Sequence, residues 1–211
     1  MTFKITLVRL TIRMTYSGPS RMLMMANRAF LTKWGGADLI VAFFPCIYFC
    51  ENNQLALSYY HNNYKNLGYK ERTEKILQRM RDREYFYSLI CKMVAVAFEK
   101  KLRMIIENPW NGATYLKQNF VISPSLIDHN RRLRGDYFTK PTAYWFINCE
   151  PTQGYTIQCD KEKKSISKSK AGKAAGLCSE DRSMMSPDYA RNFICDFILG
   201  KEQIGSQMSL F

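Results

Sequence analysis

The feature that most constrains the fold is a pair of short apolar runs that flank one long amphipathic stretch. The first run extends from Asp38 to Phe44 and ends at Pro45, and the second spans residues 102–106. Both runs have the length of a single strand and are rich in aliphatic and β-branched residues. This pattern is typical of strands that are buried on both faces of a parallel sheet.

The stretch between the two runs predicts a helix. Apolar residues recur at steps of three and four from residue 71 to about residue 101. Strand, long helix and strand form a βαβ unit, whose crossover places the carboxyl ends of both strands at one edge of the sheet. A third apolar run, residues 144–149, predicts another strand, and Ser186-Pro187 predicts the start of a closing helix. The expected fold class is α/β, with ligands bound at the carboxyl edge.

The composition indicates one folded domain with an anionic partner. The chain has 211 residues, of which 46% are hydrophobic, so it can bury a core and is not intrinsically disordered. Its formal net charge is +13. An excess of this size favours nucleic acid or a membrane surface as the partner.

Metal sites and membrane spans are not expected. The seven cysteines are scattered without a Cys-x-x-Cys pair, and His61 and His129 have no ligand spacing around them. No apolar run approaches the roughly 20 residues that a membrane-spanning helix requires. Arg9 and Arg13 interrupt the apolar N-terminal stretch, so it does not resemble a signal peptide, and the expected location is the cytoplasm.

Three segments show no strand or helix pattern. Residues 1–36 are basic and contain no clear glycine-rich phosphate loop. Residues 47–70 are rich in asparagine and tyrosine, which predicts a long loop or a lid over a site. Residues 161–173 contain six lysines and predict an exposed loop, which either binds phosphates or is a solvated linker.

Two reactive side chains follow the first two predicted strands. Cys46 comes directly after Pro45, and Glu107 opens the sequence Glu107-Asn108-Pro109. A thiolate at one strand end can add to an electron-poor ring while a carboxyl group at the next strand end handles a proton, which suits a pyrimidine. The alternatives are that Cys46 is a small core residue and that Glu107 caps a loop or pairs with an arginine.

Five short motifs follow one another along the chain. They are Pro45-Cys46, Glu107-Asn108-Pro109, Lys140-Pro141-Thr142 before Trp145, Arg182-Ser183, and Pro187-Asp-Tyr-Ala190. Together with the intervening elements, they resemble the motifs of DNA cytosine-5 methyltransferases, and more closely those of the short methylase-like proteins of phages and mobile elements. The resemblance covers about residues 37 to 200.

The resemblance implies a doubly wound, Rossmann-like sheet of methyltransferase type and an enzyme that transfers a methyl group from S-adenosylmethionine to cytosine in DNA. Cys46 would attack carbon 6 of a flipped-out cytosine, and Glu107 would hydrogen-bond and protonate ring nitrogen 3. Carbon 5 would then be nucleophilic enough to accept the methyl group. Flipping is required because the target atom cannot be reached inside the base stack. Pro45 and Pro109 would hold the turns, and Asn108 would brace the two loops against each other.

Candidate DNA-binding cations lie in a loose counterpart of the family's Gln-x-Arg-x-Arg motif, near the third predicted strand, and in the lysine-rich segment. They are Arg131, Arg132, Arg134, Lys140, Lys163, Lys164, Lys168 and Lys170.

The chain departs from the family at its front. Active members begin with a strand and a Phe-x-Gly-x-Gly loop for the cofactor, whereas Tyr16-Ser17-Gly18 lies too close to Pro45 for two strands and their helices. We therefore expect a partial sheet in which N-terminal strands are missing or degenerate. The expected division is a basic segment at 1–36, a methyltransferase-like catalytic domain at 37–200 with a basic loop at 160–175, and a tail at 201–211.

Two alternatives to an active enzyme follow from this departure. One is a catalytically inactive nucleic-acid-binding protein that retains the basic surface and the base pocket. The other is one half of a split methyltransferase, whose partner chain supplies the cofactor half.

Overall fold

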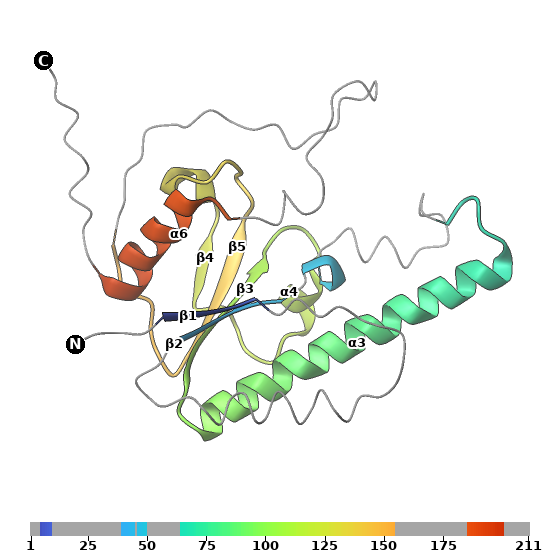
Figure 1. Ribbon diagram of the computed structural model, residues 1–211, viewed down its shortest axis with the longest axis horizontal. Helices are drawn as coiled ribbons and strands as arrows, with labels where there is room; N and C mark the ends of the chain where they lie inside the picture. Colours follow the sequence, from blue (N-terminus) through green and yellow to red (C-terminus); the bar gives the residue numbers. More distant parts are fainter. Residues whose placement is uncertain (1–4, 10–38, 45, 50–63, 155–184, 201–211) are drawn as a thin grey trace, which may run out of the picture. The chain divides into compact units, whose positions relative to one another are not determined.

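The chain folds as an α/β protein around an open sheet (Figure 1). The computed structural model describes residues 5–9, 39–44, 46–49, 64–154 and 185–200. Two compact units are present, residues 1–127 with 143–150 and residues 128–142 with 151–211, and each is described by itself. The α/β fold class expected from the sequence is confirmed.

The first unit holds most of the sheet. Four strands form an open, mixed sheet in the order β2-β3-β5-β4. They are β2 (Leu39–Phe43), β3 (Arg103–Pro109), β4 (Leu126–Asp128) and β5 (Thr142–Ile147). The apolar runs predict a parallel sheet. The observed sheet is only partly parallel, and the prediction holds for the pair β2 and β3.

A fifth strand, β1 (Ile5–Arg9), pairs in parallel with β2, with Val8 opposite Ala42. The sequence predicts that N-terminal strands are missing or degenerate, and the structure has one short N-terminal strand, at residues 5–9. The apolar N-terminal stretch, which does not resemble a signal peptide, is long enough for a strand at the edge of the sheet.

The predicted βαβ unit is confirmed. β2 and β3 run parallel, and α3 (Tyr69–Glu99) connects them. β3 is longer than predicted, because Glu107, Asn108 and Pro109 are its last three residues. The β2–β3 ladder ends at the pair Phe43–Glu107, so Pro109 lies beyond the last β2 partner, where a residue without an N–H is tolerated.

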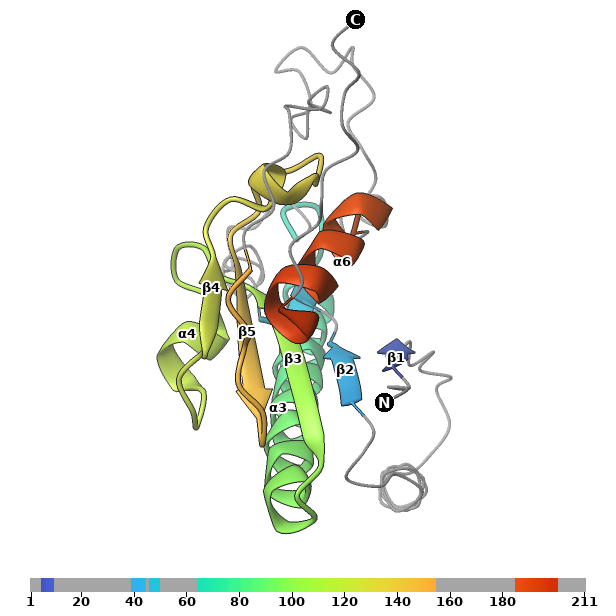
Figure 2. The ribbon, with the colours of Figure 1, turned by 90° about the vertical axis from the view of Figure 1, so that its left-hand side faces the viewer.

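The core lies between α3 and one face of the sheet, and α3 runs along that face in Figure 2. Every second residue of the strands points into it. The strand residues are Ile40 and Ala42 of β2, Met104 and Ile106 of β3, and Ala143, Trp145 and Ile147 of β5. Leu39, Val41 and Ile105 point to the other face and are also buried, which confirms the burial of both faces.

The turn from α3 to β3 is fixed by one side chain. Asn148 follows β5, and its Nδ2 donates to the carbonyl oxygens of Ala97 at 2.7 Å and Leu102 at 2.9 Å. Asn148 and Lys101 both have left-handed backbone conformations, with φ of 54° and 52°. Asparagine is among the residues that tolerate this conformation best.

The second unit contains the predicted closing helix, α6 (Pro187–Ile194), which continues as the π-helical turn η3 (Cys195–Leu199). Ser186 is the N-cap, since its hydroxyl accepts from the N–H of Tyr189 at 3.1 Å, and Pro187 occupies the first helical position. Among the helices of the described segments, none combines enough length with enough hydrophobic character to cross a bilayer.

Candidate active site at the carboxyl edge of the sheet

Cys46 begins η1 (Cys46–Tyr48), the short 3-10 turn that follows β2. The N–H of Phe49 donates to the carbonyl oxygen of Cys46 at 2.9 Å and closes this turn. The thiol is reduced and half-buried. Cys46 is therefore not a fully buried core residue.

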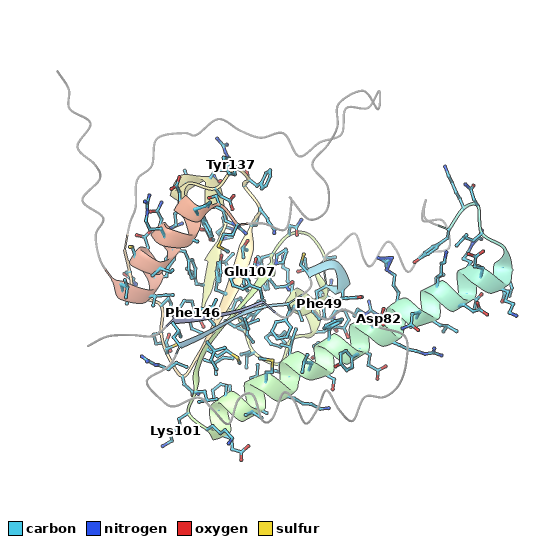
Figure 3. All side chains as sticks on the ribbon, viewed as in Figure 1. Phe49, Asp82, Lys101, Glu107, Tyr137 and Phe146 are labelled. Atoms are coloured by element: carbon cyan, nitrogen blue, oxygen red, sulfur yellow. The ribbon has the colours of Figure 1, made fainter. Side chains whose placement is uncertain are left out.

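Glu107 lies in β3 near the same edge. Its neighbour Ile106 belongs to the core against α3, so Glu107 points to the opposite face of the sheet. Only 7% of its surface is exposed. Figure 3 shows Glu107 within the sheet.

The register of the sheet brings Cys46 and Glu107 to one edge. Phe43, the last residue of β2, is opposite Glu107 in the parallel ladder. The turn that carries Cys46 starts just beyond Phe43, and Glu107 is followed by the last residues of β3. This placement agrees with the sequence-based prediction that both residues lie at the carboxyl ends of adjacent strands.

Phe49 and Tyr115 join the loops that follow β2 and β3. The N–H of Tyr115, the first residue of α4 (Tyr115–Asn119), donates to the carbonyl oxygen of Phe49 at 2.8 Å, and the two rings stack with centroids 6.3 Å apart. Phe49 is fully buried. Sequence reasoning missed both residues, because neither a carbonyl acceptor nor a short helix leaves a periodic signal.

Asn108, which is expected to brace the two loops, is a buried residue of β3. Its side chain has no exposed surface, and within the described segments neither its amide nitrogen nor its amide oxygen has a hydrogen-bond partner. The contact between the two loops that the structure describes is the one between Phe49 and Tyr115. A buried amide without partners is costly and is uncommon away from functional sites.

Tyr48 lines the side of the turn that faces α3. Its ring stacks on Phe86 at 4.7 Å between centroids. Burial raises the pKa of the Tyr48 phenol, the negative charge of Asp82 raises this pKa further, and the positive charge of Arg79 opposes the shift. Two charged side chains of α3 therefore act on the turn that begins with Cys46.

Two of the candidate DNA-binding arginines have structural contacts in the second unit. Arg131, 1% exposed, forms an ion pair with the equally buried Asp136, and its guanidinium lies 4.4 Å from the ring centre of Tyr189. Arg134 binds Asp128 at 3.2 Å and Asp196 at 3.1 Å. A guanidinium held by buried carboxylates is a poor phosphate ligand, so these pairs favour a structural role for both arginines.

The other predicted site residues divide into described and undescribed positions. Arg132 and Lys140 are half-buried in the second unit, and Pro109 is buried at the end of β3. Several lie outside the described residues: Pro45, Lys163, Lys164, Lys168, Lys170, Arg182 and Ser183. Most of the predicted lid at 47–70 and the whole basic loop at 160–175 do so as well.

Within the segments that the structure describes, no three His, Cys, Asp or Glu side chains come together as metal ligands. Among the described residues, the edge has the thiol of Cys46, the carboxyl group of Glu107 and the buried amide of Asn108. Comparisons with models of protein families, with curated proteins and with solved structures gave no match.

Proposed function

We propose that the chain acts on DNA as a cytosine-5 methyltransferase-like enzyme, with Cys46 as nucleophile and Glu107 as its proton-handling partner. The observation that carries this proposal is the register, which brings a half-buried thiol and a buried carboxyl group to one edge of adjacent parallel strands. In open α/β sheets, that edge is where ligands bind.

In the proposed reaction, Cys46 acts as a thiolate and its sulfur bonds to carbon 6 of the ring, while protonated Glu107 donates its proton to nitrogen 3. Carbon 5 then bonds to the methyl group of S-adenosylmethionine, whose bond between sulfur and methyl breaks, so that S-adenosylhomocysteine leaves. Loss of the carbon-5 proton to water and return of the nitrogen-3 proton to Glu107 break the bond between Cys46 and carbon 6 and release the thiolate.

S-adenosylmethionine is the proposed second substrate and supplies the methyl group. β1 lies beside β2 and runs parallel to it, so the carboxyl end of β1 opens at the same edge as Cys46. The residues after β1, 10–38, lie outside the described segments. We therefore propose the edge beyond β1 and β2 as the donor side of the site and assign no residue to it.

The test is transfer of a labelled methyl group from S-adenosylmethionine to cytosine-containing duplex DNA. We expect Cys46→Ser and Glu107→Gln to reduce the rate by at least about a hundredfold, because each removes a group that acts in the transition state. Cys91→Ser, which changes another half-buried thiol on α3, is the matched control and should keep wild-type activity.

A second readout tests the covalent step directly. With 5-fluorocytosine in place of the target base, carbon 5 carries no proton to lose after methylation, so a Cys46–DNA adduct should accumulate and survive denaturation. An adduct in Cys46→Ser, or equal transfer by this variant and the wild type, contradicts the proposed mechanism. DNA binding without transfer would favour the inactive nucleic-acid-binding alternative.

A further inference from the structure

The N-terminal half of α3 continues past the sheet. The side of α3 that packs on the core with apolar residues in the C-terminal half carries basic residues in the N-terminal half. In Figure 1, this half of the helix extends beyond the strands of its own unit. Phe86 and Ile90 are buried in the core, whereas Lys75, Arg79 and Arg83 occupy the preceding turns of the same side. Residues four apart lie along one side of a helix, about 6 Å from one another, so the three cations form a row.

A cavity of about 280 Å³ lies beside this row, and Tyr64 and four residues of α3 line it. The α3 residues are Lys75, Gln78, Arg79 and Asp82. Tyr64 is held against the start of α3, because the guanidinium of Arg72 donates to the carbonyl oxygens of Tyr64 at 3.1 Å and Leu67 at 2.9 Å. Arg72 thus holds Tyr64, which lines the cavity, and is not part of the cationic row.

The lining carries two cations and one anion. Asp82 accepts a hydrogen bond from the Nε2 of Gln78 at 2.8 Å. Lys75 pairs with Glu71 at 3.2 Å, but both side chains are about half exposed. An exposed pair of this kind is worth little, so it competes weakly with a phosphate.

The cavity and the row lie next to the candidate active site in the same unit. Arg79 and Asp82 act electrostatically on Tyr48, in the turn that begins with Cys46. Arg83 lies 4.6 Å from the ring centre of Tyr115, whose N–H is bonded to Phe49 of that turn. The basic side of α3 therefore leads from solvent to the edge of the sheet where Cys46 lies.

We propose that this side of α3 binds the phosphate backbone of the polynucleotide strand that carries the target base, with Lys75 and Arg79 in the cavity as its cationic contacts and Arg83 continuing the row. The proposal rests on the proposed function for its ligand, and it adds the surface that holds the strand. Positive charges in a row beside a reactive edge match a strand of phosphates better than a single free anion.

The experiment measures binding of a fluorescent oligonucleotide by anisotropy at several salt concentrations. The inward variant, Lys75→Gln with Arg79→Gln, loses one lysine and one arginine from the cavity. The control, Lys70→Gln with Arg81→Gln, removes the same charges from exposed positions on the outward side of the same helix. Both variants change the net charge equally, and circular dichroism checks that both remain folded.

We expect the inward variant to bind roughly 10- to 100-fold more weakly and to reduce the slope of log K against log salt by about 2, because two phosphate contacts are lost. The outward variant should stay within about twofold of the wild type. The charge-retaining variant, Lys75→Arg with Arg79→Lys, should restore most of the affinity. Equal losses in the inward and outward variants, or no loss in either, would overturn the proposal.

The outcomes separate this proposal from the proposed function. If the wild type methylates DNA and the inward and outward variants bind alike, only the α3 surface is wrong. If the inward variant alone loses affinity and the wild type transfers no methyl group, the α3 surface stands and the methyltransferase proposal fails. A wild type that binds no oligonucleotide at low salt contradicts both.

Discussion

At the scale of single residues, the edge of the sheet contains polar side chains whose burial is energetically unfavourable. The carboxyl group of Glu107 and the amide of Asn108 are both buried, although glutamate and asparagine side chains are mostly exposed in folded proteins. Asn108 carries the cost more plainly, since its amide atoms have no hydrogen-bond partner within the described segments. Polar groups of this kind persist where a function requires them.

Replacement of Asn108 by leucine tests this interpretation. Leucine has nearly the same shape without the buried polar atoms, so we expect Asn108→Leu to leave the free energy of unfolding unchanged or raise it by about 1 to 2 kcal/mol. The rate of methyl transfer should fall at least about tenfold. Urea denaturation and the transfer assay measure the two effects, and a loss of stability above about 2 kcal/mol would show that the amide has a structural role.

At the scale of elements, the apolar patterns predicted the βαβ unit, the third strand and α6. Each of those segments buries one face, so its apolar residues recur with the period of a helix or a strand, and this pattern can be recognised in the sequence. The short elements α4, β4 and η1 were missed. Their positions depend on tertiary contacts, such as the indole N–H of Trp145 that donates to the carbonyl oxygen of Ile122 at 3.0 Å, and such contacts leave no local pattern.

The residues of the candidate site also divide into those that the sequence pattern predicts and those that depend on tertiary contacts. Cys46 and Glu107 could be predicted because each follows an apolar run that defines a strand. The connection of the two loops through Phe49 and Tyr115 could not be predicted. The ion pairs of Arg131 and Arg134 with buried carboxylates were also missed, since a basic run has the same sequence whether solvent or carboxylates surround it.

Asn148 gives the element-scale prediction. Its amide nitrogen bonds two carbonyl oxygens at the turn from α3 to β3, and both carbonyls belong to buried residues. Asn148→Ala should lower the free energy of unfolding by about 2 to 3 kcal/mol, because two buried acceptors lose their donor. The control is Asn119→Ala, since Asn119 donates one exposed hydrogen bond, to Tyr115 at 3.0 Å, and should cost below about 0.5 kcal/mol. Equal costs in chemical denaturation would contradict this account.

At the scale of the whole molecule, the two units differ in the side chains that they bury: mainly apolar in the first, and charged as well as apolar in the second. The first has an apolar core between α3 and the sheet. In the second, Arg134 lies between Asp128 and Asp196, both almost fully buried, and the hydroxyl of Tyr189 donates to Asp128 at 3.0 Å. Breaking a buried ion pair is far more costly than breaking an exposed one, because a desolvated charge is left without its partner.

This contrast predicts that the second unit can be destabilised separately. Arg134→Met should cost the second unit about 3 to 5 kcal/mol, since two buried carboxylates lose their cation. Arg191→Met removes the exposed pair with Asp188, at 3.3 Å, and should cost below about 1 kcal/mol. Hydrogen exchange resolves the effect by region: in Arg134→Met, the amides of α6 should lose protection while those of the buried half of α3 keep it. Equal loss in both helices would mean that the two units unfold as one cooperative structure, so that the ion pairs stabilise the whole chain and not the second unit alone.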